Sequence, residues 1–398
     1  MQEQSTGNSS TGSQRGETAP FSILHTEWSN GWGGQGHRII LECIKVMALG
    51  HKVVIAAQPD SPLYNKALQS GIPVEPVRIR GNFDLLAIRD LCRLIRKHRI
   101  TVVNTHSSRD TWVASLAAKL SGVPLLIRTR HISTPISTNP FNFVHHLADG
   151  ISTTGEMIRE ELIKVNRMSP GRVMSIPSGV SLERFDLSKG DGSKVRREFH
   201  IPDHSPLVVM VAVFRGMKRH DLLIAAVGLL REKFPEMKVL LAGKGTDSEA
   251  MKHLIAEAGL QDTIIAAGNR DDIPDVLAAA DIVVLTSDKD EGVPQSLTQA
   301  MVMERPVVAA PVGGIPELVL DGETGLLAAT GDAGSFAVNI ERLLEDDGLR
   351  KRLGTAARQH VLGNYTDDIM AEKTIAFYQR LFTRKTDTPQ QKQARVSD

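Results

Sequence analysis

The stretch DIVVLTSDKDEGVPQSLTQAM, residues 281–301, contains the pattern that decides the fold. It opens with an apolar run at 281–287, which is typical of a buried strand. A short polar loop follows, and Pro294 then stands at the first position of a predicted helix, where its missing N–H would be unpaired anyway. A strand that runs through a short loop into a helix is the repeating unit of a parallel α/β sheet.

The same unit recurs on both sides of this stretch. Runs rich in Val, Ile and Leu alternate with helical patterns, which predicts parallel sheets covered by helices on both faces. In the first half the predicted strands are 21–26, 52–57, 101–106, 124–129, 150–153 and 172–177, and the predicted helices are 36–48, 85–97, 111–120 and 156–165. In the second half the strands are 206–214, 237–243, 262–268, 281–287 and 306–311, with helices that include 219–234 and 248–258.

The alternation pauses between 178 and 205, where Ser, Gly, Asp, Lys and Pro show no apolar period. This pause predicts a linker between two doubly wound, Rossmann-like domains, with ligands bound in the cleft between them. The predicted boundaries are a disordered tail at 1–20, a first domain at 21–185, a second domain at 186–365, a C-terminal helix at 366–384 and a tail at 385–398.

Composition excludes several classes of protein. The 398 residues suffice for two cores, and 41% hydrophobic with 23% charged residues is typical of a globular, water-soluble chain. An aromatic content of 4% and a formal net charge of +1 argue against a nucleic-acid-binding protein. The two cysteines, Cys43 and Cys92, stand in apolar stretches and are expected to be buried thiols.

The same features predict where the protein resides. No apolar run reaches the roughly 18 residues of a membrane-spanning helix, and 1–20 lacks the apolar core of a signal peptide. We therefore expect a cytoplasmic protein, either free or resting peripherally on the inner face of the membrane. The helix at 85–97 carries Arg89, Arg93 and Arg96 and fits an anionic membrane surface, although a solvated outer face is the preferred interpretation.

A glycine-rich segment, GWGGQG at 31–36, follows the first predicted strand and opens a helix. Glycine permits close approach of a ligand to the backbone, and the helix N-terminus offers free N–H groups to an anion. The segment also matches the dinucleotide fingerprint G-x-G-x-x-G, with Asp60 as a candidate ribose ligand, so an NAD(P)-dependent dehydrogenase is one alternative. The loop TEWSN at 26–30 separates strand and glycines, which weakens that match and also leaves a ligand-free turn open.

The most informative residues follow the strand at 281–287. N–H groups at the start of the next helix would hold a diphosphate, while Glu291 accepts hydrogen bonds from sugar hydroxyls and Gln299 reaches a ribose. Arg215 and Lys218 follow the first strand of the second half, where a cation would stabilise the charge on a leaving diphosphate. Glu317 stands at a further predicted helix start and has either a ligand or a role limited to that helix terminus.

Taken together, these segments resemble the retaining GT-B glycosyltransferases of family 4, the glycosyl transferases group 1. The resemblance spans about 21–381 and rests on the order of GWGGQG, VVNTH, VAVFRGMKRHDLLIAA, LLAGKG, AAGNRDDIPDVLAAADIVVLTS, EGVPQSLTQAM and APVGGIPELVLDGETGLL. It accounts for the second half of the chain, which the dehydrogenase alternative leaves unexplained. It implies an EC 2.4 enzyme that moves a sugar from a nucleotide-diphosphate sugar to an acceptor with retention of configuration. No metal or other cofactor is expected.

The resemblance also implies roles for single residues. His106 would lie in the cleft beside the transferred sugar and, with Glu291, is an expected catalytic residue. The expected donor-binding residues are Gly33, Gly34, Arg215, Lys218, Gly243, Arg270, Gly292, Val293, Pro294, Gln295, Ser296 and Gln299. Two features depart from the family: Gln299 replaces the second of two glutamates, and the short Arg215–Lys218 spacing makes Lys218 the better match. These departures keep open a catalytically silent nucleotide-sugar-binding protein.

Basic residues at strand ends of the first half bear on the acceptor. Arg109, Arg128 and Arg130 lie where the family binds acceptors, and their charge indicates an anionic acceptor. By resemblance, the acceptor belongs to a bacterial lipopolysaccharide, an exopolysaccharide or a lipid-linked glycan.

Overall fold

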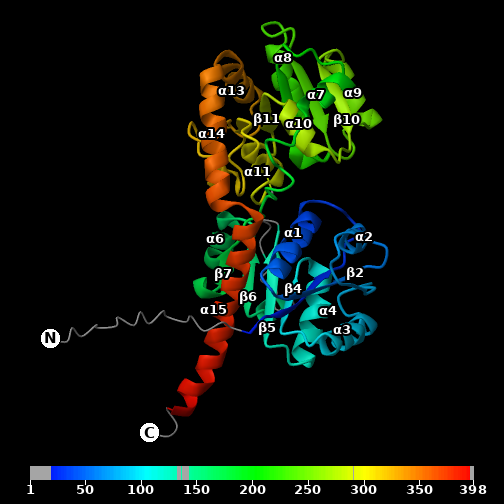
Figure 1. Ribbon diagram of the computed structural model, residues 1–398, viewed down its shortest axis with the longest axis vertical. Helices are drawn as coiled ribbons and strands as arrows, with labels where there is room; N and C mark the ends of the chain where they lie inside the picture. The colour runs from blue at the N-terminus through cyan, green and yellow to red at the C-terminus, as the bar shows by residue number, and fades with distance from the viewer. Residues whose placement is uncertain (1–18, 132–135, 137–142, 290, 395–398) are drawn as a thin grey trace, which may run out of the picture.

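The computed structural model describes residues 19–131, 136, 143–289 and 291–394. Nearly all of the predicted tail at 1–20, and residues 395–398 of the predicted C-terminal tail, lie outside the described residues. Two parallel sheets follow one another along the long axis of the molecule (Figure 1). One has seven strands in the order β3-β2-β1-β4-β5-β6-β7, and the other has six in the order β10-β9-β8-β11-β12-β13. The predicted α/β architecture of two Rossmann-like sheets, the GT-B fold class, is confirmed.

Apolar runs form the first sheet because both of its faces are covered. Ile23 and Leu24 are both fully buried, Ile23 beneath helix α1 and Leu24 beneath α3 and α4. Its strands are β1 (Ser22–Glu27), β2 (Lys52–Ala57), β3 (Val74–Pro76), β4 (Val102–Thr105), β5 (Leu125–Arg130), β6 (Gly150–Thr153) and β7 (Val173–Ser175). Its helices are α1 (Gly34–Ala48), α2 (Pro62–Gln69), α3 (Leu85–Lys97), α4 (Ser108–Leu120), α5 (Val144–Leu147) and α6 (Glu156–Lys164). Cys43 and Cys92 are buried free thiols, as expected.

The second sheet follows the same plan. Its strands are β8 (Leu207–Val211), β9 (Lys238–Ala242), β10 (Ile264–Gly268), β11 (Ile282–Leu285), β12 (Val307–Ala309) and β13 (Leu326–Leu327). Its helices are α7 (Gly192–Glu198), α8 (His220–Leu230), α9 (Glu249–Glu257), α10 (Ile273–Ala279), α11 (Gln295–Val302), α12 (Ile315–Leu318), α13 (Ala333–Glu345) and α14 (Asp347–Asn364). Helix α7 lies inside the predicted linker, where Asp191 caps it by accepting from the backbone N–H groups of Ser193 and Lys194.

One local prediction is wrong. Pro294 caps α11 instead of occupying its first turn, because its ψ of 125° is extended, and Gln295 is the first helical residue. Pro294 and its neighbours still join the loop after β11 directly to α11, so the predicted course of the chain is unchanged.

Helix α15 (Asp367–Ala394) returns from the second sheet to the first (Figure 1). Phe377, Tyr378 and Leu381 are buried in the core between α1 and the first sheet. The Tyr378 hydroxyl accepts a hydrogen bond of 3.0 Å from the Asn104 amide. The helix continues past the predicted boundary at 384, so 385–394 of the predicted tail are helical. Among the described residues, no helix is long and apolar enough to cross a lipid bilayer.

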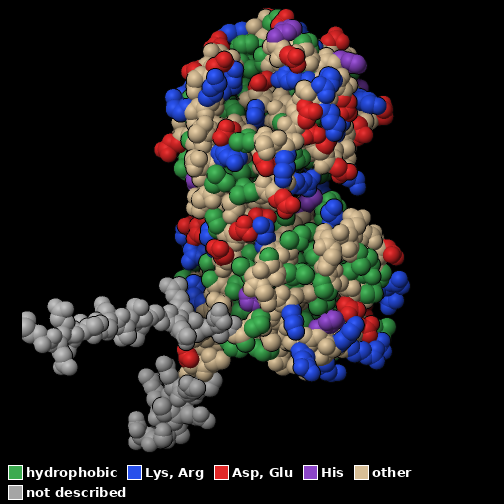
Figure 2. Space-filling view, in the orientation of Figure 1, with side chains coloured by type: hydrophobic (Ala, Val, Ile, Leu, Met, Phe, Trp, Pro, Cys, Tyr) green, Lys and Arg blue, Asp and Glu red, His purple; other side chains and the backbone are tan. Residues whose placement is uncertain are grey.

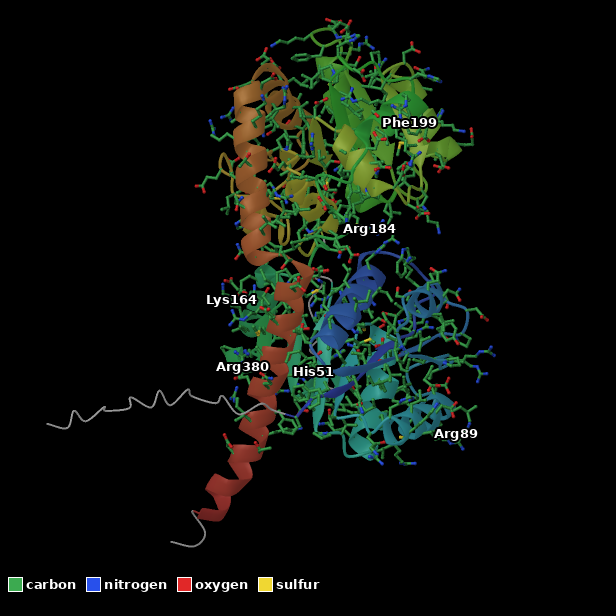
Figure 3. All side chains as sticks on the ribbon, in the orientation of Figure 1. His51, Arg89, Lys164, Arg184, Phe199 and Arg380 are labelled. Carbon is green, nitrogen blue, oxygen red and sulfur yellow. The ribbon has the colours of Figure 1, made fainter. Side chains whose placement is uncertain are left out.

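The two halves touch at the carboxyl ends of their strands, where the outline of the molecule narrows (Figure 2). The carbonyl of Thr154, directly after β6, accepts from the backbone N–H of Val293 at 3.1 Å. The Glu317 carboxylate accepts from the backbone N–H of Glu156 at 2.8 and 3.1 Å, which caps α6 from the other half. Arg184 lies between the halves in Figure 3. The loop after β11 is thereby held against the end of the first sheet.

Candidate active site

Glu291 lies in the loop between β11 and α11 and is only 7% exposed. Its carboxylate accepts a hydrogen bond of 2.5 Å from the Ser287 hydroxyl and forms an ion pair with the ammonium group of Lys218. Lys218 ends the short 3-10 helix η3 (Gly216–Lys218) after β8, and the Thr286 hydroxyl donates to its carbonyl at 2.9 Å. Two predicted site residues that are distant in sequence therefore meet at the carboxyl end of the second sheet.

Two glycines between β12 and α12 pack closely against the loop that contains Glu291. The backbone N–H of Gly314 donates to the Glu291 carbonyl at 3.2 Å. Gly313 has a φ of 59°, and a Cβ atom there would lie 1.9 Å from the same carbonyl oxygen. A Cβ atom on Gly314 would lie 2.8 Å from the carbonyl carbon of Gly292. Only glycine permits this approach, so the pair determines where Glu291 stands.

Thr154, in the first half of the chain, also contacts the loop that contains Glu291. A Cβ atom on Gly292 would lie 2.5 Å from the Thr154 hydroxyl oxygen, and the N–H of Val293 is already bonded to the Thr154 carbonyl. The predicted backbone donors of Gln295 and Ser296 lead α11, where N–H groups have no partner within the helix. Those two groups remain predicted donors to a diphosphate.

The remaining predicted donor-binding residues of the second half differ in their placement. Gly243 has a φ of 148°, and a Cβ atom there would lie 2.1 Å from the Ala212 carbonyl oxygen, so glycine is required where β8 and β9 end. Arg270 is held in ion pairs with Glu198 and Asp272 and does not join the Glu291 loop. The side chains of Arg215, which is exposed, and Gln299, which is half-buried, form no hydrogen bond with another described residue.

The glycine-rich segment has two distinct parts. Gly33 caps α1 and Gly34 begins it, and a Cβ atom at either position would meet nothing within 4 Å. A Cβ atom on Gly36 would instead lie 2.9 Å from the Trp32 ring. Gly36 is therefore needed for packing, while Gly33 and Gly34 face open space at a helix N-terminus, as a donor-binding role requires.

Two buried carboxyl groups share one hydroxyl beside this segment. The Ser107 hydroxyl oxygen lies 2.5 Å from a carboxyl oxygen of Glu27 and 2.7 Å from one of Asp110. A hydroxyl has a single hydrogen, so one of the two carboxyl groups must itself be protonated to satisfy both contacts. Burial, followed by the charge of Glu27, raises the pKa of Asp110 to about 7. Glu27 also accepts from the Gln35 amide, so this carboxyl group helps to hold the glycine-rich segment.

His106 is buried at 4% exposure, and other histidines occupy both of its ring nitrogens. Its Nε2 lies 2.9 Å from Nδ1 of His25, and its Nδ1 lies 3.1 Å from Nε2 of His131. Burial, followed by the charges of His25 and His131, lowers the pKa of His106 well below its usual value, so the ring is neutral. This arrangement leaves neither ring nitrogen of His106 free for a ligand.

The predicted acceptor-binding arginines fall into two groups. Arg109 is exposed, and its guanidinium lies 4.2 Å from the centre of the Trp28 ring. Arg128 and Arg130 are each 7% exposed and lie on one face of β5, as residues two apart in a strand do. The Arg128 guanidinium contacts His145, and its buried Nε has no hydrogen-bond partner. Burial, followed by the charge of Arg130, lowers the pKa of Arg128 to about 9.

Arg128 is therefore a buried cation that forms no direct ion pair with a carboxylate of the described residues, although the charge of Asp110 acts on it and opposes the fall in its pKa. In the described part of the chain, no group of three or more His, Cys, Asp and Glu side chains is arranged to hold a metal ion. Sequence reasoning missed the contributions of His25, Glu27 and Thr154, which all lie at carboxyl ends of strands in the first sheet. That position was the one signal available for them.

Known families match both halves of the chain. Residues 32–184 match "Glycosyltransferase Family 4", and residues 191–360 match "Glycosyl transferases group 1". The N-acetyl-alpha-D-glucosaminyl L-malate synthase of Bacillus anthracis is 26% identical over 332 residues, covering 81% of this chain and 79% of that protein. A D-inositol 3-phosphate glycosyltransferase of Stackebrandtia nassauensis is 27% identical over 318 residues, covering 74% and 71%.

Solved structures share the fold. A glycosyltransferase from Rickettsia africae superposes with a TM-score of 0.82 at 21% identity, covering 92% of this chain and 99% of that one. The Anabaena protein HepE in complex with UDP-glucose gives a TM-score of 0.79 at 21% identity, covering 90% and 99%.

Proposed function

Since the chain belongs to the group 1 glycosyl transferases of family 4 and is a nucleotide-sugar glycosyltransferase, we propose that it glycosylates an anionic acceptor with retention of configuration. The proposed acceptor carries its hydroxyl on a bacterial lipopolysaccharide, an exopolysaccharide or a lipid-linked glycan. The reaction is proposed to need no metal ion. The observation that supports an anionic acceptor is the buried guanidinium of Arg128, which has no direct ion pair with a described carboxylate and whose Nε has no hydrogen-bond partner.

On the donor side, the proposal rests on the loop after β11. Lys218 and Glu291 are in contact, which supports the proposed roles of Lys218 as a cation for the diphosphate and of Glu291 as an acceptor for sugar hydroxyls. This is the arrangement that a breaking sugar–phosphate bond requires, because negative charge develops on the leaving oxygen. The leading N–H groups of α11 add positive potential on the same side.

The proposed step breaks the bond between the anomeric carbon and the diphosphate oxygen. The acceptor oxygen forms its new bond on the same face of the sugar, and its proton passes to the leaving diphosphate. Lys218 and the start of α11 stabilise the diphosphate as it takes up the bonding electron pair. No side chain is required as a covalent nucleophile.

On the acceptor side, the buried charge of Arg128 favours an anionic ligand. A buried charge without a counter-ion is unfavourable, and an arginine fork binds carboxylate or phosphate through two parallel hydrogen bonds. An anionic group on the acceptor would give Arg128 a counter-ion in direct contact, in addition to the more remote charge of Asp110. Two relatives have anionic compounds in their names, L-malate in one and D-inositol 3-phosphate in the other, which supports the same class of acceptor.

The test is Arg128→Gln, assayed with phosphorylated or carboxylated acceptors and their uncharged counterparts. A hydrogen bond to a charged group contributes about 1.5–3 kcal/mol, so the acceptor KM should rise roughly 10- to 100-fold while the donor KM stays unchanged. Arg352→Gln is the control, because Arg352 is an exposed arginine on α14 to which no role is assigned. Arg89, by contrast, points outward from α3, away from the second half (Figure 3). An unchanged acceptor KM in Arg128→Gln would rule out the anionic acceptor.

We also propose peripheral membrane contact through α3. Leu85 and Leu86 are exposed at its start, Phe83 is exposed beside them, and Arg89 and Arg93 are exposed on the same helix. Lys and Arg side chains gather at the lower right of the molecule, where α3 lies (Figure 2). Exposed apolar residues beside basic ones fit an anionic lipid surface. Co-sedimentation with anionic vesicles that disappears at moderate salt would support the contact, and no binding at low salt would refute it.

A further inference from the structure

Arg219 stands where the chain turns from η3 into α8, directly after Lys218. Its φ of 49° and ψ of 51° are left-handed, a conformation that costs energy in any residue with a Cβ atom. Because the chain turns at Arg219, α8 begins at His220 and Lys218 does not continue into it. Lys218 is thereby left outside α8, where its ammonium group pairs with Glu291.

Two residues after β11 hold the backbone of this turn. The Thr286 hydroxyl lies 2.9 Å from the carbonyl oxygen of Lys218 and 2.8 Å from that of Arg219. The backbone N–H of Asp288 donates to the carbonyl of Met217 at 3.1 Å. Three successive carbonyl groups of the turn therefore lie against the segment that follows β11.

The guanidinium of Arg219 adds a contact between side chains. Its Nη1 lies 3.4 Å from Oδ2 of Asp288, and its Nε and Nη2 donate to the Asp221 carboxylate on α8 at 2.8 to 3.1 Å. The other carboxylate oxygen of Asp288, Oδ1, is buried and has no hydrogen-bond partner. Among the described residues, Arg219 alone forms an ion pair with Asp288, so loss of the guanidinium would release this carboxylate from the turn.

The stability of the fold does not account for this pair. The side chains of Arg219 and Asp288 are 31% and 25% exposed, and ion pairs that water reaches contribute little to stability. The turn itself does not need an arginine either, because glycine adopts the left-handed conformation without steric cost. What the pair adds is a link between two loops. Arg219 is the neighbour of Lys218, and Asp288 stands three residues before Glu291.

We infer that Arg219 and Asp288 are positioning residues of the donor site, which hold Lys218 against Glu291 so that its ammonium group meets the leaving diphosphate. This inference rests on the proposed function. A displaced Lys218 would stabilise the charge on the leaving oxygen less well, whereas the proposed N–H donors at the start of α11 would stay in place. Loss of the pair should therefore lower kcat more than it raises the donor KM.

The kinetic test is a double-mutant cycle of Arg219→Gly and Asp288→Asn. Arg219→Gly keeps the left-handed turn and removes the guanidinium, and Asp288→Asn removes the charge at the other end of the contact. Each change should lower kcat about 10- to 100-fold, the range expected for a site displaced by about 1 Å, with a donor KM near wild type. The double variant should lose no more than the more impaired single variant, because both changes break the same contact.

Asp221→Asn is the matched control. It removes the other carboxylate that Arg219 binds, on α8, and leaves the contact with the loop after β11 in place, so kcat should stay near wild type. A kcat near wild type in Arg219→Gly or in Asp288→Asn, or losses that multiply in the double variant, would overturn the inference and leave the proposed function standing.

Thermal unfolding separates positioning from a general loss of structure. Arg219→Gly removes left-handed strain together with a partly exposed ion pair, so its Tm should not fall below that of the wild type even though kcat does. A fall in Tm that accompanies the loss of kcat would show a structural role and overturn the inference. Absence of transfer by the wild-type protein with every UDP-, GDP- and ADP-sugar tested would instead refute the proposed function, and the positioning role with it.

Discussion

Gly313→Ala tests whether the close packing of Gly313 and Gly314 holds the loop after β11 in place. A Cβ atom at 313 would lie 1.9 Å from the Glu291 carbonyl oxygen, whereas ordinary contacts begin at 3.4 Å, so the two must separate by about 1.5 Å. Gly322 provides a matched control in the same half. Its φ of 73° is close to the 59° of Gly313, but a Cβ atom there would meet nothing within 4 Å.

Both alanine variants introduce left-handed strain of about 1–2 kcal/mol, which should lower Tm by roughly 2–8 °C. Only Gly313→Ala displaces Glu291, and a misplacement of about 1 Å in a site can reduce turnover about 100-fold. We therefore expect kcat/KM, measured by release of the nucleoside diphosphate, to fall about 100-fold in Gly313→Ala and to stay near wild type in Gly322→Ala. Equal kcat/KM values in the two variants would refute the supporting role of Gly313.

Two further predictions concern the first half of the chain. The pKa of Asp110 is about 7 in the folded protein and about 3.9 in an unfolded chain, so its contribution to stability is present in full below pH 4 and is lost as pH rises through 7. Asp110→Asn should therefore flatten the fall of the unfolding free energy between pH 4 and 7, measured by urea titration, and a slope equal to wild type would contradict the raised pKa of Asp110. Tyr378→Phe removes the acceptor of the buried Asn104 amide and should cost about 1–3 kcal/mol. Thermal unfolding would measure this loss, and an unchanged Tm would show that the bond does not hold α15 in place.

The bounds of a strand or helix could be predicted where its apolar pattern and its flanking residues indicate the same ends. The strand at 52–57 and the helix at 85–97 have the predicted bounds, and Asp84 caps that helix by accepting from the N–H groups of Leu86 and Ala87. Helix α7 was missed because its seven residues are too few and too polar for a clear apolar period.

Residues of the candidate site could be predicted where each one comes soon after a single predicted strand. Lys218 and Glu291 were each predicted from a position after a strand, and the structure brings them into contact. The contacts of His106 with His25 and His131 arise from the strand order β1-β4-β5. The alternation of strands and helices in the sequence does not reveal that order. The contacts of Glu27 and Asp110 with one Ser107 hydroxyl likewise depend on β1 lying beside the start of α4.

The most direct test of the central claim is the melting shift of wild type and Glu291→Gln with UDP, GDP, ADP, their sugar conjugates and NAD(P)H. A ligand at 100 times its Kd adds about 2.7 kcal/mol. The account predicts that one nucleoside diphosphate and its sugar conjugate stabilise the wild type, and that Glu291→Gln keeps the shift with the diphosphate but loses the increment that the sugar adds. Stabilisation by NAD(P)H alone, or an equal sugar-dependent shift in both proteins, would contradict the assignment of the donor site to Glu291.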